Sequence, residues 1–152
     1  MYRALCVSLL ALAAVLRAGQ DLGEHAEYIG GTLPAIPLRD SGLMQTIDQT
    51  YFIFLSKHST IRIPYERINL VEYGQKVDRR YLSAVVISPL FLLAKKREHF
   101  LTIGFEDDSG KQQALIFRVA KSDIRAALVT LEARTGREVQ YQDEEARKAG
   151  KG

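Results

Sequence analysis

The residue types that most often carry chemistry are sparse in this chain of 152 residues. Its three histidines are His25, His58 and His99, and none has a second His, Cys or carboxylate at a metal-ligand spacing such as H-x-x-x-H. We therefore expect all three imidazoles to lie at the surface or at strand edges. The pattern predicts no metal site.

One short run carries several carboxylates. Glu106-Asp107-Asp108-Ser109-Gly110 could attract calcium, but it lacks the alternating ligands and the closing Glu of a calcium loop. A solvated hairpin turn is the favoured interpretation. The serines at positions 83, 88, 109 and 122 stand in no G-x-S-x-G context, and the chain has no Gly-rich phosphate loop. We predict no catalytic residue and no cofactor, and we expect a non-enzymatic protein.

The segment with most functional promise is Leu-Phe-Leu-Leu-Ala-Lys-Lys-Arg-Glu-His at 90–99. An exposed apolar patch beside three cations could insert into an anionic membrane surface, with the cations pairing with phosphates. The arginines at 79 and 80 would add to this surface if the fold brings them near. The candidate residues for a membrane- or anion-binding surface are Leu90, Phe91, Lys95, Lys96, Arg97, Arg79 and Arg80.

A structural explanation competes with this one. Leu90, Phe91 and Leu93 could pack into the core or plug one end of a barrel, and the basic run would then mark the return to solvent. Burial is favoured, because large exposed apolar patches are uncommon on monomers. Membrane attachment stays the alternative.

The charge of the chain argues against one class of partner. The formal net charge is +3, and the first 19 residues contain Arg3 and Arg17 without any acidic residue. The remainder therefore carries 19 basic and 18 acidic residues, or +1. Because sequence-independent nucleic-acid binding needs many unbalanced cations, we expect no nucleic-acid partner.

The N-terminus has the form of an export signal. Arg3 precedes an apolar run at 4–16, which is too short to span a bilayer and has the length of a signal-peptide core. Cleavage after Ala18 or after Gly19 gives no small-x-small site, so an uncleaved anchor or a misplaced start codon stays open. We expect an exported protein, periplasmic or extracellular, which is tethered to the membrane if the leader is retained. Cys6, the one cysteine, lies inside this leader.

The remaining sequence is divided into a linker, one domain and a tail. Glycines and prolines break up residues 20–41, which we interpret as a linker, and the charged residues 140–152 form a predicted flexible tail. Between them, at 42–139, short apolar runs alternate with turn residues. The predicted strands are 43–47, 51–55, 60–63, 68–73, 81–87, 100–105 and 112–119. A short helical or looped piece is expected after Ser88-Pro89.

The clearest predicted element is a helix near the end of the chain. Ile124, Ala127, Leu128 and Leu131 recur at helical spacing. We expect Ser122 as its N-cap and Gly136 as its C-cap. The predicted fold class is α+β: a mostly antiparallel barrel or sandwich of six to seven strands closed by one C-terminal helix.

This plan resembles the bacterial pleckstrin-homology-like and GRAM-like domains. The stretch Ile61-Arg62-Ile63-Pro64-Tyr65-Glu66-Arg67-Ile68 is similar to a strand crossing in those domains, and the segment 124–139 is similar to their closing helix. The resemblance covers residues 42–139, and the apolar insert at 84–94 departs from a minimal barrel. It implies a binding or scaffolding module, a fold that serves many unrelated functions.

We therefore expect a non-enzymatic module that binds a protein partner through its sheet edge or its barrel mouth. Peripheral attachment to an anionic membrane through 90–99 is the second hypothesis. A small ligand carrier or an enzyme with an interior pocket is the third.

Overall fold

The structure is a computed structural model that describes residues 23–76, 86–87 and 98–151. The described part is mostly β, with helices near its C-terminus, so the α+β class is confirmed. Its elements are β1 (Glu24–Gly31), β2 (Asp40–Gln45), β3 (Tyr51–Ser56), β4 (Thr60–Pro64), the 3-10 turn η1 (Tyr65–Arg67), β5 (Ile68–Gly74), β6 (Val86–Ile87), β7 (His99–Glu106), β8 (Gln112–Val119), α3 (Ile124–Thr135), β9 (Gln140–Tyr141) and α4 (Glu144–Lys151).

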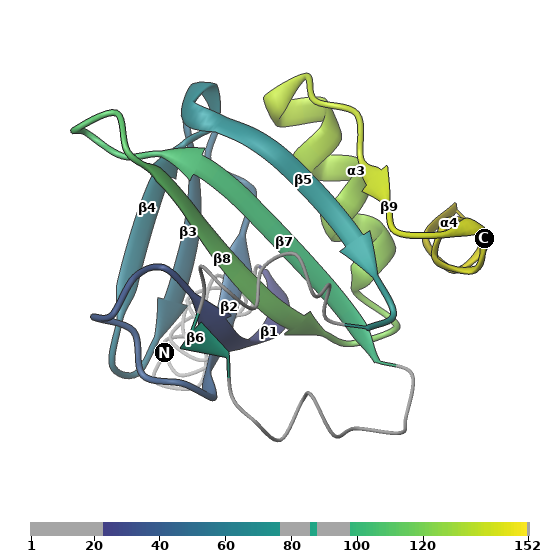
Figure 1. The fold of residues 1–152 in the computed structure, drawn as a ribbon, viewed down its shortest axis with the longest axis horizontal. Helices are drawn as coiled ribbons and strands as arrows, with labels where there is room; N and C mark the ends of the chain where they lie inside the picture. The colour runs from purple at the N-terminus through teal and green to yellow at the C-terminus, as the bar shows by residue number, and fades with distance from the viewer. Residues whose placement is uncertain (1–22, 77–85, 88–97, 152) are drawn as a thin grey trace, which may run out of the picture.

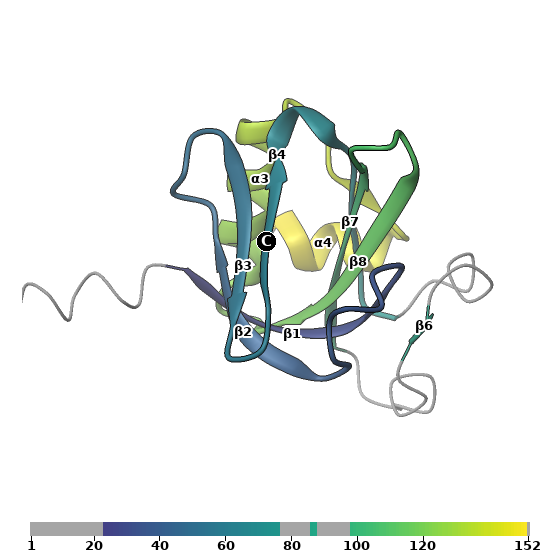
Figure 2. The same ribbon diagram turned by 90° about the vertical axis from the view of Figure 1, so that its left-hand side faces the viewer.

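All the described strands belong to one sheet. Its order is β4-β3-β2-β1-β8-β7-β5-β9, with β6 paired to β1, and every pairing is antiparallel except β5 with β9. The path runs from β4 to β9 without closing. Figure 2 shows how the sheet bends, with β3 and β4 on one side and β7 and β8 on the other. Nine strands are thus described, where the sequence predicted six to seven.

The aromatic centre of the core lies on the concave face. The ring of Phe117 lies 6.0 Å from Tyr28, 6.1 Å from Phe52 and 4.9 Å from Phe54, measured between centroids. These rings come from β1, β3 and β8, so they tie the two sides of the sheet together. Burial raises the pKa of Tyr28 to about 12.

Helix α3 packs against this core beside β5 (Figure 1). The predicted stripe of Ile124, Ala127, Leu128 and Leu131 is the buried face. Gly136 ends the helix in the left-handed conformation with φ 65°, as predicted. The N-cap prediction was wrong by one residue: the cap is Asp123, and Ser122 donates its hydroxyl to the Asp123 carboxylate at 2.6 Å.

The predicted linker at 20–41 was wrong over its described part. Residues Glu24–Gly31 form β1, which pairs with β2, β8 and β6 near the middle of the sheet. Apolar and polar residues do not alternate regularly in its sequence, which ends in Gly30-Gly31, so its intrinsic propensity to form a strand is weak. Hydrogen bonding to neighbours on both sides compensates for it.

The predicted flexible tail was also wrong. Residues 140–151 include β9 and an additional helix, α4, whose Ala146 and Gly150 are buried. The domain therefore includes the C-terminal segment, and two helices follow the strands in the described part of the chain. Neither of them, nor any other described helix, has the length and hydropathy needed to span a bilayer.

A smaller apolar cluster lies on the opposite face of the sheet. Ile87 of β6 packs there with Ile29, Phe100, Ala114 and Ile116. Of the predicted strand at 81–87, only Val86–Ile87 is among the described residues, and these two residues form β6.

Candidate functional site

One edge of the sheet is only half covered. Strand β7 pairs with β5 from Ile68 to Gly74, whereas β9 pairs with the other side of β5 at Glu72 and Tyr73 alone. Among the described residues, Ile68–Val71 therefore has a strand partner on one side only. An uncovered strand edge presents backbone N–H and C=O groups to which another strand can bind.

A groove of about 790 Å³ lies beside this uncovered half. One wall is Asn69, Leu70 and Val71 of β5, and the other is the chain from Arg137 to Tyr141 with α4 behind it. Val71 and Val139, which are buried, contribute apolar lining, whereas most of the other lining residues are polar or charged.

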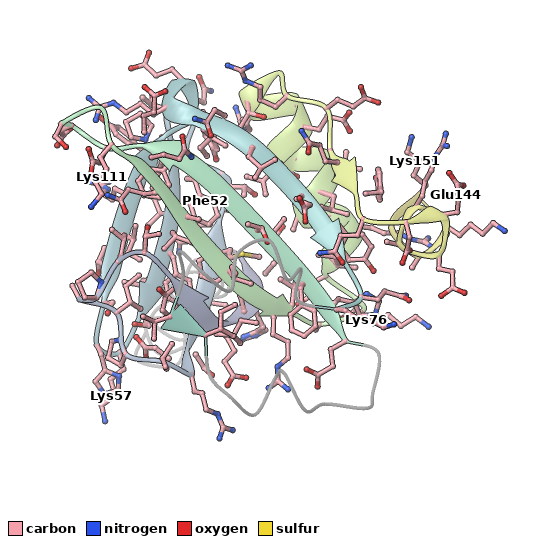
Figure 3. The ribbon with its side chains drawn as sticks, in the orientation of Figure 1. Phe52, Lys57, Lys76, Lys111, Glu144 and Lys151 are labelled. Carbon is pink, nitrogen blue, oxygen red and sulfur yellow. The ribbon has the colours of Figure 1, made fainter. Side chains whose placement is uncertain are left out.

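Charges of both signs surround the groove. Three cations, at 137, 147 and 151, and three carboxylates, at 138, 143 and 144, line it. Figure 3 shows Glu144 and Lys151 projecting from α4. The Lys151 ammonium lies 5.6 Å from the centroid of the Tyr141 ring, which also lines the groove. The rim therefore carries no excess of either sign among these six residues.

The uncovered half of β5 is held in place from the side of β7 and β8. Asn69 and Gln112 exchange two side-chain hydrogen bonds, at 2.7 and 3.1 Å. The register shifts between Ile68 and Leu70, and a β-carbon at Gly104 would lie 2.9 Å from that of Leu70. Only glycine permits this close approach. Contacts within the domain therefore hold this part of β5 in place.

The opposite edge of the sheet, β4, is better protected. It is five residues long and ends at Pro64, which has no N–H to donate. Arg62 on this strand is exposed and lies 5.6 Å above the Tyr51 ring of β3. Charge and proline on a short strand both discourage strand addition, so β5 is the stronger candidate of the two edges.

A second hollow, of about 980 Å³, lies on the convex face across β2, β1, β8 and β7. At its centre the Glu27 carboxylate is buried between two guanidinium groups, those of Arg39 and Arg118, and Arg118 also donates to Glu98 at 3.0 Å. Burial lowers the pKa of Arg118, but Glu27 and Glu98 outweigh it, so the net shift is upward. These charges neutralise one another, which makes a structural network rather than an anion site.

The histidines occupy structural positions. His58 Nδ1 lies 3.0 Å from the buried Asp40 carboxylate, and His99 Nδ1 lies 2.5 Å from the Tyr73 hydroxyl. Burial raises the pKa of Asp40, but hydrogen bonds from Ser56 and His58 bring it below its ordinary value. His25 is exposed. Within the described ranges, no three His, Cys, Asp or Glu residues gather at metal-binding distance.

The acidic run at 106–110 forms the predicted hairpin turn. Asp107 accepts from Ser109 Oγ at 2.6 Å, from the Lys111 N–H at 3.0 Å and from Gln113 Nε2 at 2.6 Å. These hydrogen bonds hold the pKa of Asp107 well below its usual range. The carboxylate is thus occupied by its own turn.

The residues predicted for a membrane surface lie outside the described residues. They are Leu90, Phe91, Lys95, Lys96, Arg97, Arg79 and Arg80. Sequence reasoning predicted β5 as a strand but missed the groove wall at 137–151. A signal was present there, since Asp143 precedes Glu144 and Glu145, with Lys148 and Lys151 in the last turn, the charge order of a capped helix.

Comparison with known proteins adds no functional assignment. No protein-family model matches the chain, and no curated protein matches it.

Proposed function

We propose that this protein is a non-enzymatic interaction module that binds an extended segment of a protein partner along the edge of β5. The observation that carries this proposal is that Ile68–Val71 of β5 has a described strand partner on one side only, and that its accessible residues, Asn69 and Leu70, line a groove of about 790 Å³. Strand addition is a general mode of peptide recognition, in which main-chain hydrogen bonds give affinity and side-chain pockets give specificity.

The backbone orientation of β5 supports this mode. The Gln142 N–H donates to the Tyr73 carbonyl at 3.1 Å, so the Tyr73 backbone faces the open edge. Alternate residues of a strand direct their backbone groups to the same side. Val71 therefore directs its backbone groups to the same side of β5 as Tyr73 does. Because Val71 is fully buried whereas Asn69 and Leu70 are accessible, we assign the first contacts of a partner to Asn69 and Leu70.

The interior of the protein supports a surface site over an enclosed ligand site. Phe52, Phe54 and Phe117 fill the centre of the sheet with rings that have no polar atom, and Tyr28 packs against them. An interior pocket for a carried ligand would need this space and polar groups to orient the ligand.

We further propose that the fold is pleckstrin-homology-like. Two antiparallel meanders, β1–β4 and β5-β7-β8, are joined by the pairing of β1 with β8, and α3 follows β8. This order is the meander-and-helix plan that the sequence resemblance implies. The short strand β6 and the segment β9–α4 are additions to it.

We also propose that the protein is exported, on the basis of the leader at 1–19. Mass spectrometry of the mature N-terminus together with cell fractionation tests this proposal. A mature protein that begins at Met1 and fractionates with the cytosol would contradict it.

The function is tested by selecting peptides from a random displayed library against the full chain and mapping the best binders by NMR. We expect amide shifts at Ile68–Val71 and at 137–141. The other sheet edge, Thr60–Pro64, is the internal control and should not respond. Selection of no peptide above background, or shifts confined to β4, would refute the proposal.

A further inference from the structure

We infer that the C-terminal segment β9–α4 is an intramolecular occupant of the binding edge, which a partner strand displaces in order to pair with all of β5. This inference rests on the proposed function of β5. The edge has seven residues, and the chain's own β9 pairs with two of them, Glu72 and Tyr73. A strand that begins to pair at Ile68 therefore meets β9 after four residues.

The pairing that holds β9 in place is small. It consists of two residues in parallel register, an arrangement that is less stable per residue than antiparallel pairing. Gln142, the next residue, adds its N–H to the Tyr73 carbonyl and its Nε2 to the Glu72 carboxylate, both at 3.1 Å. The backbone of an incoming strand could replace the bond to the Tyr73 carbonyl in kind, whereas the bond to the Glu72 carboxylate would need a donor side chain on the partner.

The packing of α4 is also small. Its buried residues are Ala146 and Gly150, which carry at most one methyl group each. A β-carbon at Gly150 would lie 2.6 Å from Cε1 of Tyr141 and 3.3 Å from Cδ1 of Tyr73. The closest of these approaches is to Tyr141 of β9, within the segment itself, and the contact with β5 is through Tyr73. The apolar contacts of the segment with the core are those of Ala146, with Tyr141 and Ala149 packed beside it. Elements with few buried apolar contacts open at low free energy.

The helical form of α4 depends on local signals more than on this packing. Asp143 Oδ1 accepts from the Ala146 N–H at 2.6 Å, and acidic residues in the first turn and basic residues in the last turn match the helix dipole. Because these features travel with the segment, α4 can keep its helical form when β9–α4 leaves the edge. The departure removes the Ala146 contact with the core and the edge-to-face contact of Tyr141 with Tyr73 at 6.1 Å.

Displacement links affinity to the fraction of molecules in which the edge is free. When only a small fraction is open, the apparent dissociation constant exceeds the intrinsic one by the inverse of that fraction. Loosening β9–α4 should therefore tighten binding at β5 without any new contact to the partner.

The experiment compares Gly150→Gln with Lys148→Gln in the full chain. The first substitution places a side chain where a β-carbon has no room, and the second introduces the same residue on the exposed side of α4. The probe is a fluorescent synthetic peptide of residues 137–151, with a scrambled peptide of the same composition as control. Fluorescence anisotropy gives the affinity, and amide hydrogen exchange at Tyr73 and Tyr141 gives the open fraction.

We expect Gly150→Gln to bind the probe at least tenfold more tightly than the wild type, and Lys148→Gln to bind it as the wild type does. The gain in affinity should equal the increase in the open fraction that hydrogen exchange gives. If Gly150→Gln does not change the rate of hydrogen exchange, the double variant Gly150→Gln/Gln142→Ala is used, because it also removes the Gln142 side-chain hydrogen bond to Glu72. Equal binding of the probe by the wild type and by a variant with a freed edge would overturn the displacement while preserving the function of β5. Absence of binding to a freed edge, combined with a failed peptide selection, would overturn both.

Discussion

The side-chain amide of Gln142 donates a hydrogen bond of 3.1 Å to the carboxylate of Glu72, a residue that is 2% exposed. Gln142 also lies so near Gly74 that a β-carbon there would overlap its amide group. One residue of the C-terminal segment is thus tied to three consecutive positions of β5, since it also donates to the Tyr73 carbonyl. This is the point at which the segment is attached to the sheet.

Gly74→Ala should act through Gln142. The added methyl group displaces the amide from Glu72, and we expect the free energy of unfolding to fall by about 1 kcal/mol, as for the loss of one hydrogen bond to a buried group. In a Gln142→Ala background the same substitution should cost less than about 0.5 kcal/mol. Urea denaturation of the two single variants and the double variant gives the coupling. Additive effects would contradict the mechanism.

His99 should make stability depend on pH. Burial and nearby Lys121 lower its pKa, and its Nδ1 accepts from the Tyr73 hydroxyl only when the imidazole is neutral. The unfolded chain then binds a proton more readily than the folded one, so stability present above about pH 6.5 is lost as pH falls.

Urea denaturation between pH 8 and 5 measures this loss. The decline should be shallower in His99→Gln than in the wild type, while the exposed His25→Gln keeps the wild-type slope. Identical slopes in all three proteins would show that the Tyr73–His99 pair does not sense protons.

Phe117→Ala should be strongly destabilising. This ring contacts Tyr28, Phe52 and Phe54, so its removal leaves a cavity at the centre of the core. We expect a loss of about 3–5 kcal/mol, measured by thermal or chemical denaturation. Val129→Ala, at a position 66% exposed on α3, should change stability by no more than about 0.5 kcal/mol. Comparable losses in the two variants would contradict this account of the core.

Arg39 should reveal backbone strain. Its φ of 68° lies in the left-handed region, and its N–H donates to the Tyr28 carbonyl at 2.7 Å. Arg39→Gly and Arg39→Ala both remove the ion pair with Glu27, but only glycine adopts this conformation freely. We expect the glycine variant to be more stable than the alanine variant by about 1 kcal/mol. Equal stability in denaturation would refute a strained conformation at this position.

The elements that sequence reasoning located are those defined by short-range signals. The hairpin of β7 and β8 has alternating apolar residues on each side of an Asp-Asp-Ser-Gly turn, and α3 has a helical stripe before Gly136. Each signal lies within about a dozen residues, which is the range over which backbone preference and side-chain periodicity act.

Strands β1 and β9 were missed because their signals are not local. β1 is a strand through its pairing with β2 and β8, the latter from Ala26 to Val119, far apart in sequence. β9 is two residues long and has no periodicity to detect. Contacts between distant segments stabilise both, and a charged, glycine-containing stretch gives no warning of them.

The sequence by itself therefore determined the α+β class, most strands, the buried stripe of α3 and the absence of recognisable catalytic or metal-binding motifs. Only the tertiary structure decided that β5 is an edge strand, that Ile68–Val71 is uncovered, and that the supposed tail lies against it. The physical reason is that a strand's own side chains specify which face is buried, whereas its neighbours are specified by other strands. The candidate site at β5 depends on those neighbours.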